Sequence, residues 1–130
     1  MIVVDASAMV ELLLRTPAAA LVAQRVFQPS ETLHAPQVLD LEVAQVLRRY
    51  ATRAELTPAR GAQAIELLLQ FPIERYPHEP LLRRIWRLRD TLTAYDAAYI
   101  ALAEVLDAPL LTRDQRLARA PGHRARVELV

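Results

Sequence analysis

The sequence predicts an α/β domain in which helices cover a parallel sheet. Short apolar segments alternate with helical stretches of ten residues or more, and this alternation is typical of βαβ crossovers. The 130 residues, 53% of them hydrophobic, are enough for one core and too few to divide comfortably into two domains. We find no internal repeat, low-complexity tract or linker, so residues 1–130 are expected to form a single domain.

The predicted elements follow from apolar periodicity and from helix-start and helix-stop signals. Strands are expected at residues 2–4, 33–35, 73–75 and 109–111, with an edge strand at 126–129. Helices are expected at residues 6–14, 17–27, 38–53, 58–70, 80–89 and 95–106, with a short one from Asp114. Thr16-Pro17 and Thr57-Pro58 are typical helix starts, because threonine caps a helix and proline suits its first turn.

Composition excludes several classes of function. Without cysteine, the chain forms neither disulfides nor thiolate metal sites. All 16 basic residues are arginine, which disfavours receiver-type phosphoacceptors and haloacid-dehalogenase-type phosphatases, because both use a lysine. The phosphatases also need D-x-D after the first strand, where residues 5–7 read D-A-S. A net charge of +1 creates no global basic field, so any nucleic-acid binding must come from a local patch.

The N-terminal segment does not have the pattern of a signal peptide. Residues 1–14 lack a basic n-region, and Asp5 and Glu11 interrupt the apolar run. No apolar run approaches the ~20 residues that span a bilayer. A cytoplasmic protein without membrane association is therefore expected.

Three aspartates stand where a parallel sheet places its ligands. Asp5 directly follows the first strand, Asp114 comes three residues after Leu111, and Asp96 heads the helix that leads into the fourth strand. Ligands of open parallel sheets bind outside the carboxyl ends of the strands, so the three side chains are expected at one edge. Each aspartate also stands near a predicted helix start, and helix capping is the alternative explanation for each.

Asp96 and Glu42 lie on faces that are otherwise apolar. Asp96 shares its helix face with the residues at i+3, i+4 and i+7, and an ionised carboxylate there loses hydration unless something offsets the loss. Glu42 lies in mid-helix with apolar residues at i−4, i−3 and i+4, so capping cannot explain it. A buried ion pair with one of the arginines is the alternative for Glu42.

Four converging carboxylates would repel one another, by roughly 4 kcal/mol for a pair at 4 Å and an effective dielectric constant of 20. Such a cluster either takes up protons or holds a hard divalent cation. All-oxygen ligation suits Mg²⁺ or Mn²⁺, and His34, His78 and His123 show no ligand spacing and are expected at the surface or in loops. The chemistry implied is hydrolysis of a phosphodiester by a metal-activated water.

Four segments carry a family resemblance: IVVDASA (2–8), LEVAQVLRR (41–49), YDAAYIALAE (95–104) and LLTRDQRLARA (110–120). In this order they resemble the PIN-domain ribonucleases, specifically the VapC-type toxins of bacterial toxin–antitoxin pairs. YDAAYIALAE followed by LLTRD is the most specific part. The resemblance implies a three-layer α/β/α sandwich with a short, mostly parallel sheet, and a Mg²⁺- or Mn²⁺-dependent endoribonuclease.

The resemblance also implies roles for individual residues. The positions that match the family's acidic quartet are Asp5, Glu42, Asp96 and Asp114. Asp5 and Asp96 would be the principal metal ligands, and Glu42 would ligate directly or through water. Asp114 would complete a second metal site or contact the ligands without contacting the metal itself. Ser7 and Thr112 match small hydroxyl positions that hydrogen-bond the acids, although Ser7 could equally be an ordinary first-turn serine.

Two basic features have open interpretations. Arg113 either contacts a substrate phosphate or points to solvent. The basic run RRIWRLR (83–89) contains one aromatic residue, and we expect a solvated amphipathic helix with Ile85 and Leu88 inward rather than an RNA-binding face.

The resemblance further implies partners: an RNA substrate, a second copy of the chain, and the C-terminal segment of a VapB-like antitoxin. The segments MVELLL (9–14) and AAALVAQRVF (18–27) are rich enough in apolar residues to form a groove for the antitoxin. The alternative is that these residues only build the core. The rival function is a catalytically inert PIN-like domain that binds RNA or protein, and the presence of all four acids argues against it.

Overall fold

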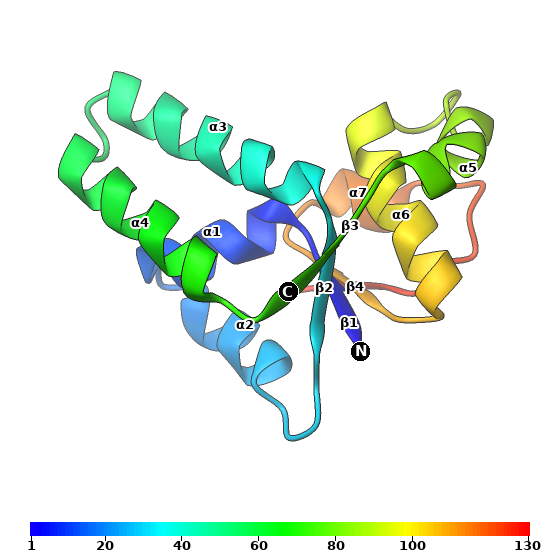
Figure 1. Cartoon of the computed structure of the whole chain (residues 1–130), viewed down its shortest axis with the longest axis horizontal. Helices are drawn as coiled ribbons and strands as arrows, with labels where there is room; N and C mark the ends of the chain where they lie inside the picture. The colour runs from blue at the N-terminus through cyan, green and yellow to red at the C-terminus, as the bar shows by residue number, and fades with distance from the viewer.

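The computed structural model describes all 130 residues as one α/β/α sandwich (Figure 1). Neighbouring strands all run parallel, in the order β3-β2-β1-β4-β5. The strands are β1 (Ile2–Val4), β2 (Leu33–Pro36), β3 (Ile73–Tyr76), β4 (Leu110–Thr112) and β5 (Val127–Leu129). The predicted α/β sandwich is confirmed, and its sheet is wholly parallel.

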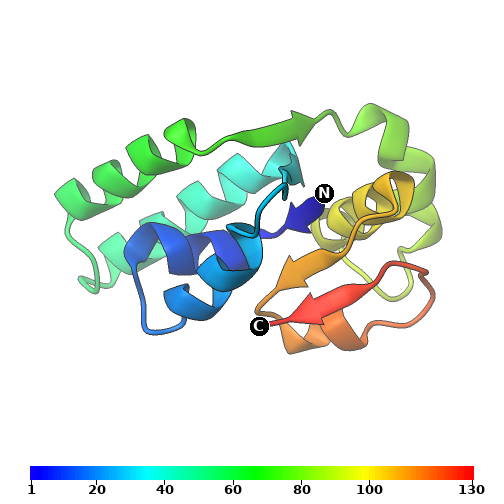
Figure 2. The same ribbon diagram turned by 90° about the horizontal axis from the view of Figure 1, so that it is seen from below.

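Two helical layers enclose the sheet. The helices are α1 (Ala6–Leu14), α2 (Ala19–Val26), α3 (Val38–Thr52), α4 (Pro58–Gln70), α5 (Leu82–Arg87), α6 (Ala94–Leu106) and α7 (Gln115–Arg119). Helices α1 to α4 lie on one side of the sheet and α5 to α7 on the other (Figures 1 and 2). This division follows from right-handed crossovers, because the chain moves from β1 out to β3 and then returns to the other side of β1.

The strand order reverses between β1 and β4, which are hydrogen-bonded neighbours in the middle of the sheet. The amide of Asp5, just beyond β1, donates to the carbonyl of Leu111 in β4 at 3.2 Å. The carboxyl ends of both strands therefore open into the same gap between the helical layers. Ligand sites of open parallel sheets lie at such a point.

Helix α6 is the central helix of its layer. It packs against β1, β2 and β4, and all seven residues from Ala97 to Ala103 are buried. Four of the seven are alanine, whose short side chains allow the helix to approach the sheet closely. This packing fixes the first turn of α6, and Asp96 within it, at the carboxyl edge of the sheet.

Two helices differ from those predicted by more than one residue at an end. The helix expected at 80–89 is a short 3₁₀ turn (Glu79–Leu81) followed by α5. Helix α2 begins at Ala19 without a side-chain cap, because the Thr16 hydroxyl donates to the Glu11 carboxylate instead. In the basic run, Ile85 and Leu88 are buried as expected, and Trp86 is exposed.

His34 lies in the core, so the expectation of a surface or loop position for it is wrong. It belongs to β2, where its Nδ1 is 2.7 Å from the Tyr76 hydroxyl and its Nε2 is 2.8 Å from the Thr32 hydroxyl. These two partners satisfy the ring, and a satisfied imidazole can be buried at little cost. Burial also lowers the pKa of His34.

No single helix is long and apolar enough to cross a membrane. By length and composition only the pair α1 and α2 approaches such a span, and the two helices meet at an angle of 112°.

Candidate active site

The four predicted acids line one cavity of about 350 Å³ at the carboxyl edge of the sheet. Asp5 follows β1, Glu42 lies on α3, Asp96 lies in the first turn of α6, and Asp114 precedes α7. Their positions in the sequence are up to 109 residues apart, and the reversal of strand order brings them together. The convergence predicted from the sequence is present in the structure.

Asp5 is almost fully buried and is held by three hydrogen bonds. Its Oδ1 accepts from the Ala8 amide at 3.0 Å and from the Ser7 hydroxyl at 2.6 Å, and its Oδ2 accepts from the Thr112 hydroxyl. Capping and site lining are therefore not alternatives here, because one carboxylate does both. Burial raises the pKa of Asp5, the hydrogen bonds oppose the rise, and the nearby charge of Asp96 adds to it.

Glu42 hydrogen-bonds a tyrosine rather than an arginine. The hydroxyl of Tyr99, a residue only 1% exposed, donates to Glu42 Oε1 at 2.7 Å. The ion pair considered as an alternative for Glu42 is absent. Burial raises the pKa of Glu42, the charges of Asp96 and Asp5 raise it further, and the bond from Tyr99 opposes them.

Asp96 is not the cap of its helix. Thr93 fills that position, and its hydroxyl accepts from the Asp96 amide at 3.2 Å. The Asp96 carboxylate is therefore left to line the cavity. Burial raises its pKa, and the charge of Asp114 raises it further.

Asp114 combines both roles, as Asp5 does. Its Oδ1 accepts from the Arg116 amide at 2.8 Å, which caps α7, and its Oδ2 lies 3.3 Å from the Arg116 guanidinium. It is the only one of the four acids with a cationic partner within 4 Å.

Ser7 and Thr112 tie the loops after β1 and β4 to each other. The Ser7 hydroxyl donates to Asp5 and accepts from the Arg113 amide at 2.9 Å. The Thr112 hydroxyl donates to Asp5 and accepts from the Asp114 amide at 2.9 Å. Two hydroxyls thus fix the relative positions of two acids that come from opposite ends of the chain.

The Arg113 side chain is directed away from this cavity. Its guanidinium donates to the Val130 carbonyl and lies 3.8 Å from Glu11, and Arg113 is not among the residues that line the cavity. The lining instead includes Gln45 and Arg49 on α3 and Arg116 on α7. All three lie within the segments that carry the family resemblance, but their spacing alone predicts no role in a site.

Tyr99 is the other site residue that sequence reasoning missed. Its spacing of three residues from Asp96 predicts only a position on the apolar face of the helix. A buried phenol requires a hydrogen-bond partner, and this requirement was the available signal. Glu42 supplies that partner from the opposite helical layer.

The donor set fits a hard divalent cation. All four acids offer oxygen only, and three of them have raised pKa values that report crowded, poorly hydrated negative charge. No three His, Asp or Glu side chains stand close enough together to form a ready-made metal site. An ion of two positive charges placed among these carboxylates would offset their repulsion.

The chain belongs to the PIN-domain family, whose model matches residues 2–123. Among named relatives it is similar to ribonuclease VapC12 of Mycobacterium tuberculosis, with 46% identity over 130 residues that cover 100% of this chain and 99% of the relative. It is also 43% identical to ribonuclease VapC1 of the same organism over 129 residues, 98% of this chain and 96% of the relative.

A solved structure has the same fold at low sequence identity. VapBC2 from Rickettsia felis, bound to a DNA fragment from its promoter, matches with a TM-score of 0.74 at 13% identity and covers 100% of this chain and 99% of that one. At this identity the likeness concerns the fold alone.

Proposed function

We propose that this protein is a Mg²⁺- or Mn²⁺-dependent endoribonuclease and the toxin of a toxin–antitoxin pair. The observation that carries the proposal is the single cavity lined by Asp5, Glu42, Asp96 and Asp114. It occurs in a chain that is 46% identical over its whole length to a named ribonuclease. We place this activity in the cytoplasm, where RNA is available as substrate.

Asp5 and Asp96 would be the principal holders of the cation, Glu42 would hold it directly or through water, and Asp114 would complete the set. When bound, the cation supplies a more acidic water and neutralises charge on the phosphodiester. Ser7, Thr112 and the Ala8 amide keep the Asp5 carboxylate in one orientation. Tyr99 does the same for Glu42, so both carboxylates are oriented before the cation arrives.

RNA cleavage with and without metal tests this proposal. We expect the purified chain to cut RNA in millimolar Mn²⁺ or Mg²⁺ and to be inactive in EDTA, and addition of its antitoxin should stop the cutting. Sequencing the 5′ ends of RNA after expression of the toxin alone would identify the target. An RNA pool that stays intact in Mn²⁺ would favour the inert binding module instead.

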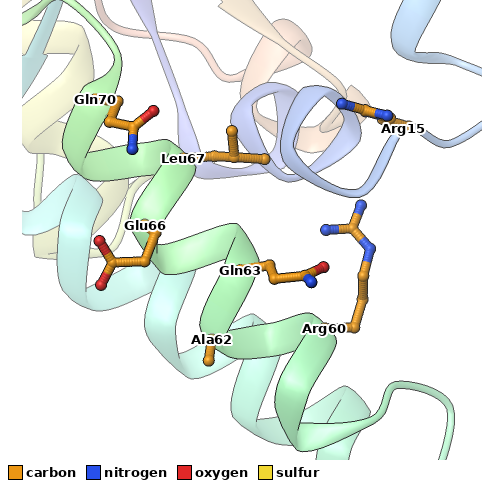
Figure 3. A pocket seen from close by; sticks show the side chains of 7 residues that line it. All are labelled: Arg15, Arg60, Ala62, Gln63, Glu66, Leu67 and Gln70. Carbon is orange, nitrogen blue, oxygen red and sulfur yellow. The ribbon is translucent and has the colours of Figure 1, made fainter.

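The antitoxin proposal is supported by exposed apolar side chains on and next to α2 and α4. Most apolar residues of 9–14 are core, but Leu21 and Phe27 on and after α2 are more than half exposed, and Phe27 stacks on Phe71 with ring centroids 6.2 Å apart. A cavity of about 690 Å³, lined mainly by polar side chains, lies between α4 and Arg15 at the end of α1 (Figure 3). We propose that the C-terminal segment of a VapB-like antitoxin lies there.

A second apolar surface lies in the other helical layer, and we propose that it joins two copies of the chain. Leu82, Trp86 and Tyr95 are each more than half exposed and surround two adjoining clefts that share Ile85. Exposed aromatic residues grouped in this way are typical of interfaces.

Sedimentation of two matched variants tests the proposed dimer. Trp86→Glu should give a monomer, because it would bury two charges at the interface, and Val105→Glu, at a residue 70% exposed on α6, should leave the dimer intact. If Trp86→Glu sediments like the parent protein, the interface lies elsewhere.

A further inference from the structure

The cavity lined by the four acids is also lined by Arg49, whose guanidinium group has no partner elsewhere in the molecule. Arg49 lies on α3 seven residues beyond Glu42, on the same face of the helix, and both side chains line the cavity. Seven residues advance an α-helix by roughly 10 Å. Arg49 therefore lines the cavity at a position about 10 Å along the helix from Glu42.

Arg49 has no carboxylate within 4 Å, and its guanidinium makes no hydrogen bond within the chain. Arg25, Arg75 and Arg84, by contrast, are each held by an acidic side chain at 2.6–2.8 Å. Arg116, the other arginine of the cavity, is paired with Asp114. Arg49 is thus the one cation of this cavity whose charge is not already engaged.

A phosphodiester strand needs such a cation here. Four carboxylates repel RNA, and a metal ion held among them offsets that repulsion only at its own position. The phosphates on either side of the scissile one would still face net negative charge. A guanidinium binds a phosphate through two parallel hydrogen bonds, which suits it to this position better than any other side chain.

We propose that Arg49 binds a backbone phosphate of the RNA, next to the phosphodiester that is cut. This inference rests on the proposed ribonuclease function and adds a substrate-binding residue to it. The contact reads no base, so it strengthens binding of any RNA strand and leaves the choice of sequence to other surfaces.

A structural role for Arg49 has different consequences. Arg49 lies in the last turn of α3, where a cation stabilises the helix dipole. Loss of that effect alone would lower the melting temperature and leave the affinity for RNA unchanged. RNA affinity therefore separates the two roles.

The chain offers a matched control in Arg48, the preceding residue. It is exposed on the same helix and carries the same charge, but it is about 100° away around the helix axis and does not line the cavity. We would compare Arg49→Gln with Arg48→Gln in an Asp96→Asn background, in which we expect cutting to be slowed by more than roughly a hundredfold. The probe is a short, mixed-sequence, single-stranded RNA in Mg²⁺, and binding is followed by fluorescence anisotropy.

We expect Arg49→Gln to weaken binding roughly tenfold and to reduce the dependence of log K on log salt by about one. Arg48→Gln should change the affinity by about twofold or less, because a cation outside the contact acts only through screened solvent. With Asp96 restored, Arg49→Gln should raise KM for RNA cleavage far more than it lowers kcat, and Arg49→Lys should recover part of the loss.

Equal affinities for the Arg49→Gln and Arg48→Gln variants would overturn the inference while leaving the ribonuclease intact. Failure of the parent chain to cut any RNA in Mn²⁺ would instead remove the function on which the inference rests.

Discussion

Replacing Asp96 by asparagine should lower the rate of RNA cleavage by more than roughly a hundredfold. Removing a group that merely supports a metal ligand costs about 10–100-fold in metal affinity or activity, and Asp96 is proposed as a ligand itself. Its carboxylate caps no helix and has no ion-pair partner, so the substitution removes charge from the cavity and affects only a hydrogen bond with Thr93. Initial rates in saturating Mn²⁺ give the measurement.

Asp107→Asn is the matched control for this substitution. Asp107 ends the same helix, its side chain is 93% exposed, and its positive φ of 48° is a conformation that asparagine also adopts readily. Its cleavage rate should equal that of the parent chain. If Asp96→Asn cuts as fast as Asp107→Asn, the acidic cavity is not the site of hydrolysis.

The Asp96→Asn substitution should also increase the stability of the metal-free protein at about pH 7.5. Burial and neighbouring charge raise the pKa of Asp96, so the folded chain holds this proton more tightly than the unfolded chain does. The resulting stabilisation is complete below the ordinary carboxyl pKa of about 4 and is lost as the pH rises through the raised value. Asparagine carries no charge, so its advantage in melting temperature should be largest at neutral pH and shrink towards pH 4.

Mn²⁺ should reverse this order of stability. A cation that binds only the folded state adds about 2.7 kcal/mol when its free concentration is one hundred times Kd, or roughly 10 °C for a domain of this size. The parent chain should gain this amount and the Asp96→Asn variant far less, so the parent should become the more stable of the two. Melting curves in EDTA and in Mn²⁺ provide the test, and an unchanged order in both would contradict a metal site at Asp96.

The sequence was sufficient for the sheet and for the acidic cavity because both depend on local signals. Apolar runs define parallel strands, and a carboxylate directly after such a run is carried to the edge of the sheet by the strand itself, as with Asp5. Glu42 could be identified because its helix position excludes capping. In each case a pattern within a few residues restricts the position of one side chain.

The contacts between these segments could not be predicted in this way. The bond from Tyr99 to Glu42 crosses from one helical layer to the other, and nothing near either residue encodes the separation of the layers. The burial of His34 depends on its partner Tyr76, which lies on the next strand, 42 residues away, so no pattern near His34 predicts it. Arg49 lines the cavity because of the direction in which α3 runs, and the packing of α3 on the sheet determines that direction.

The two hydroxyls that join the loops after β1 and β4 have a consequence for the timing of activity during synthesis. Thr112 is translated 107 residues after Asp5, and Asp114 follows it, so the ribosome must synthesise the intervening segments before these side chains exist. Until that point the nascent chain has Asp5 without the bond from Thr112 that helps to orient it. We therefore expect a nascent chain that ends before Thr112 to be unable to cut RNA, because it lacks both Asp114 and the bond that orients Asp5.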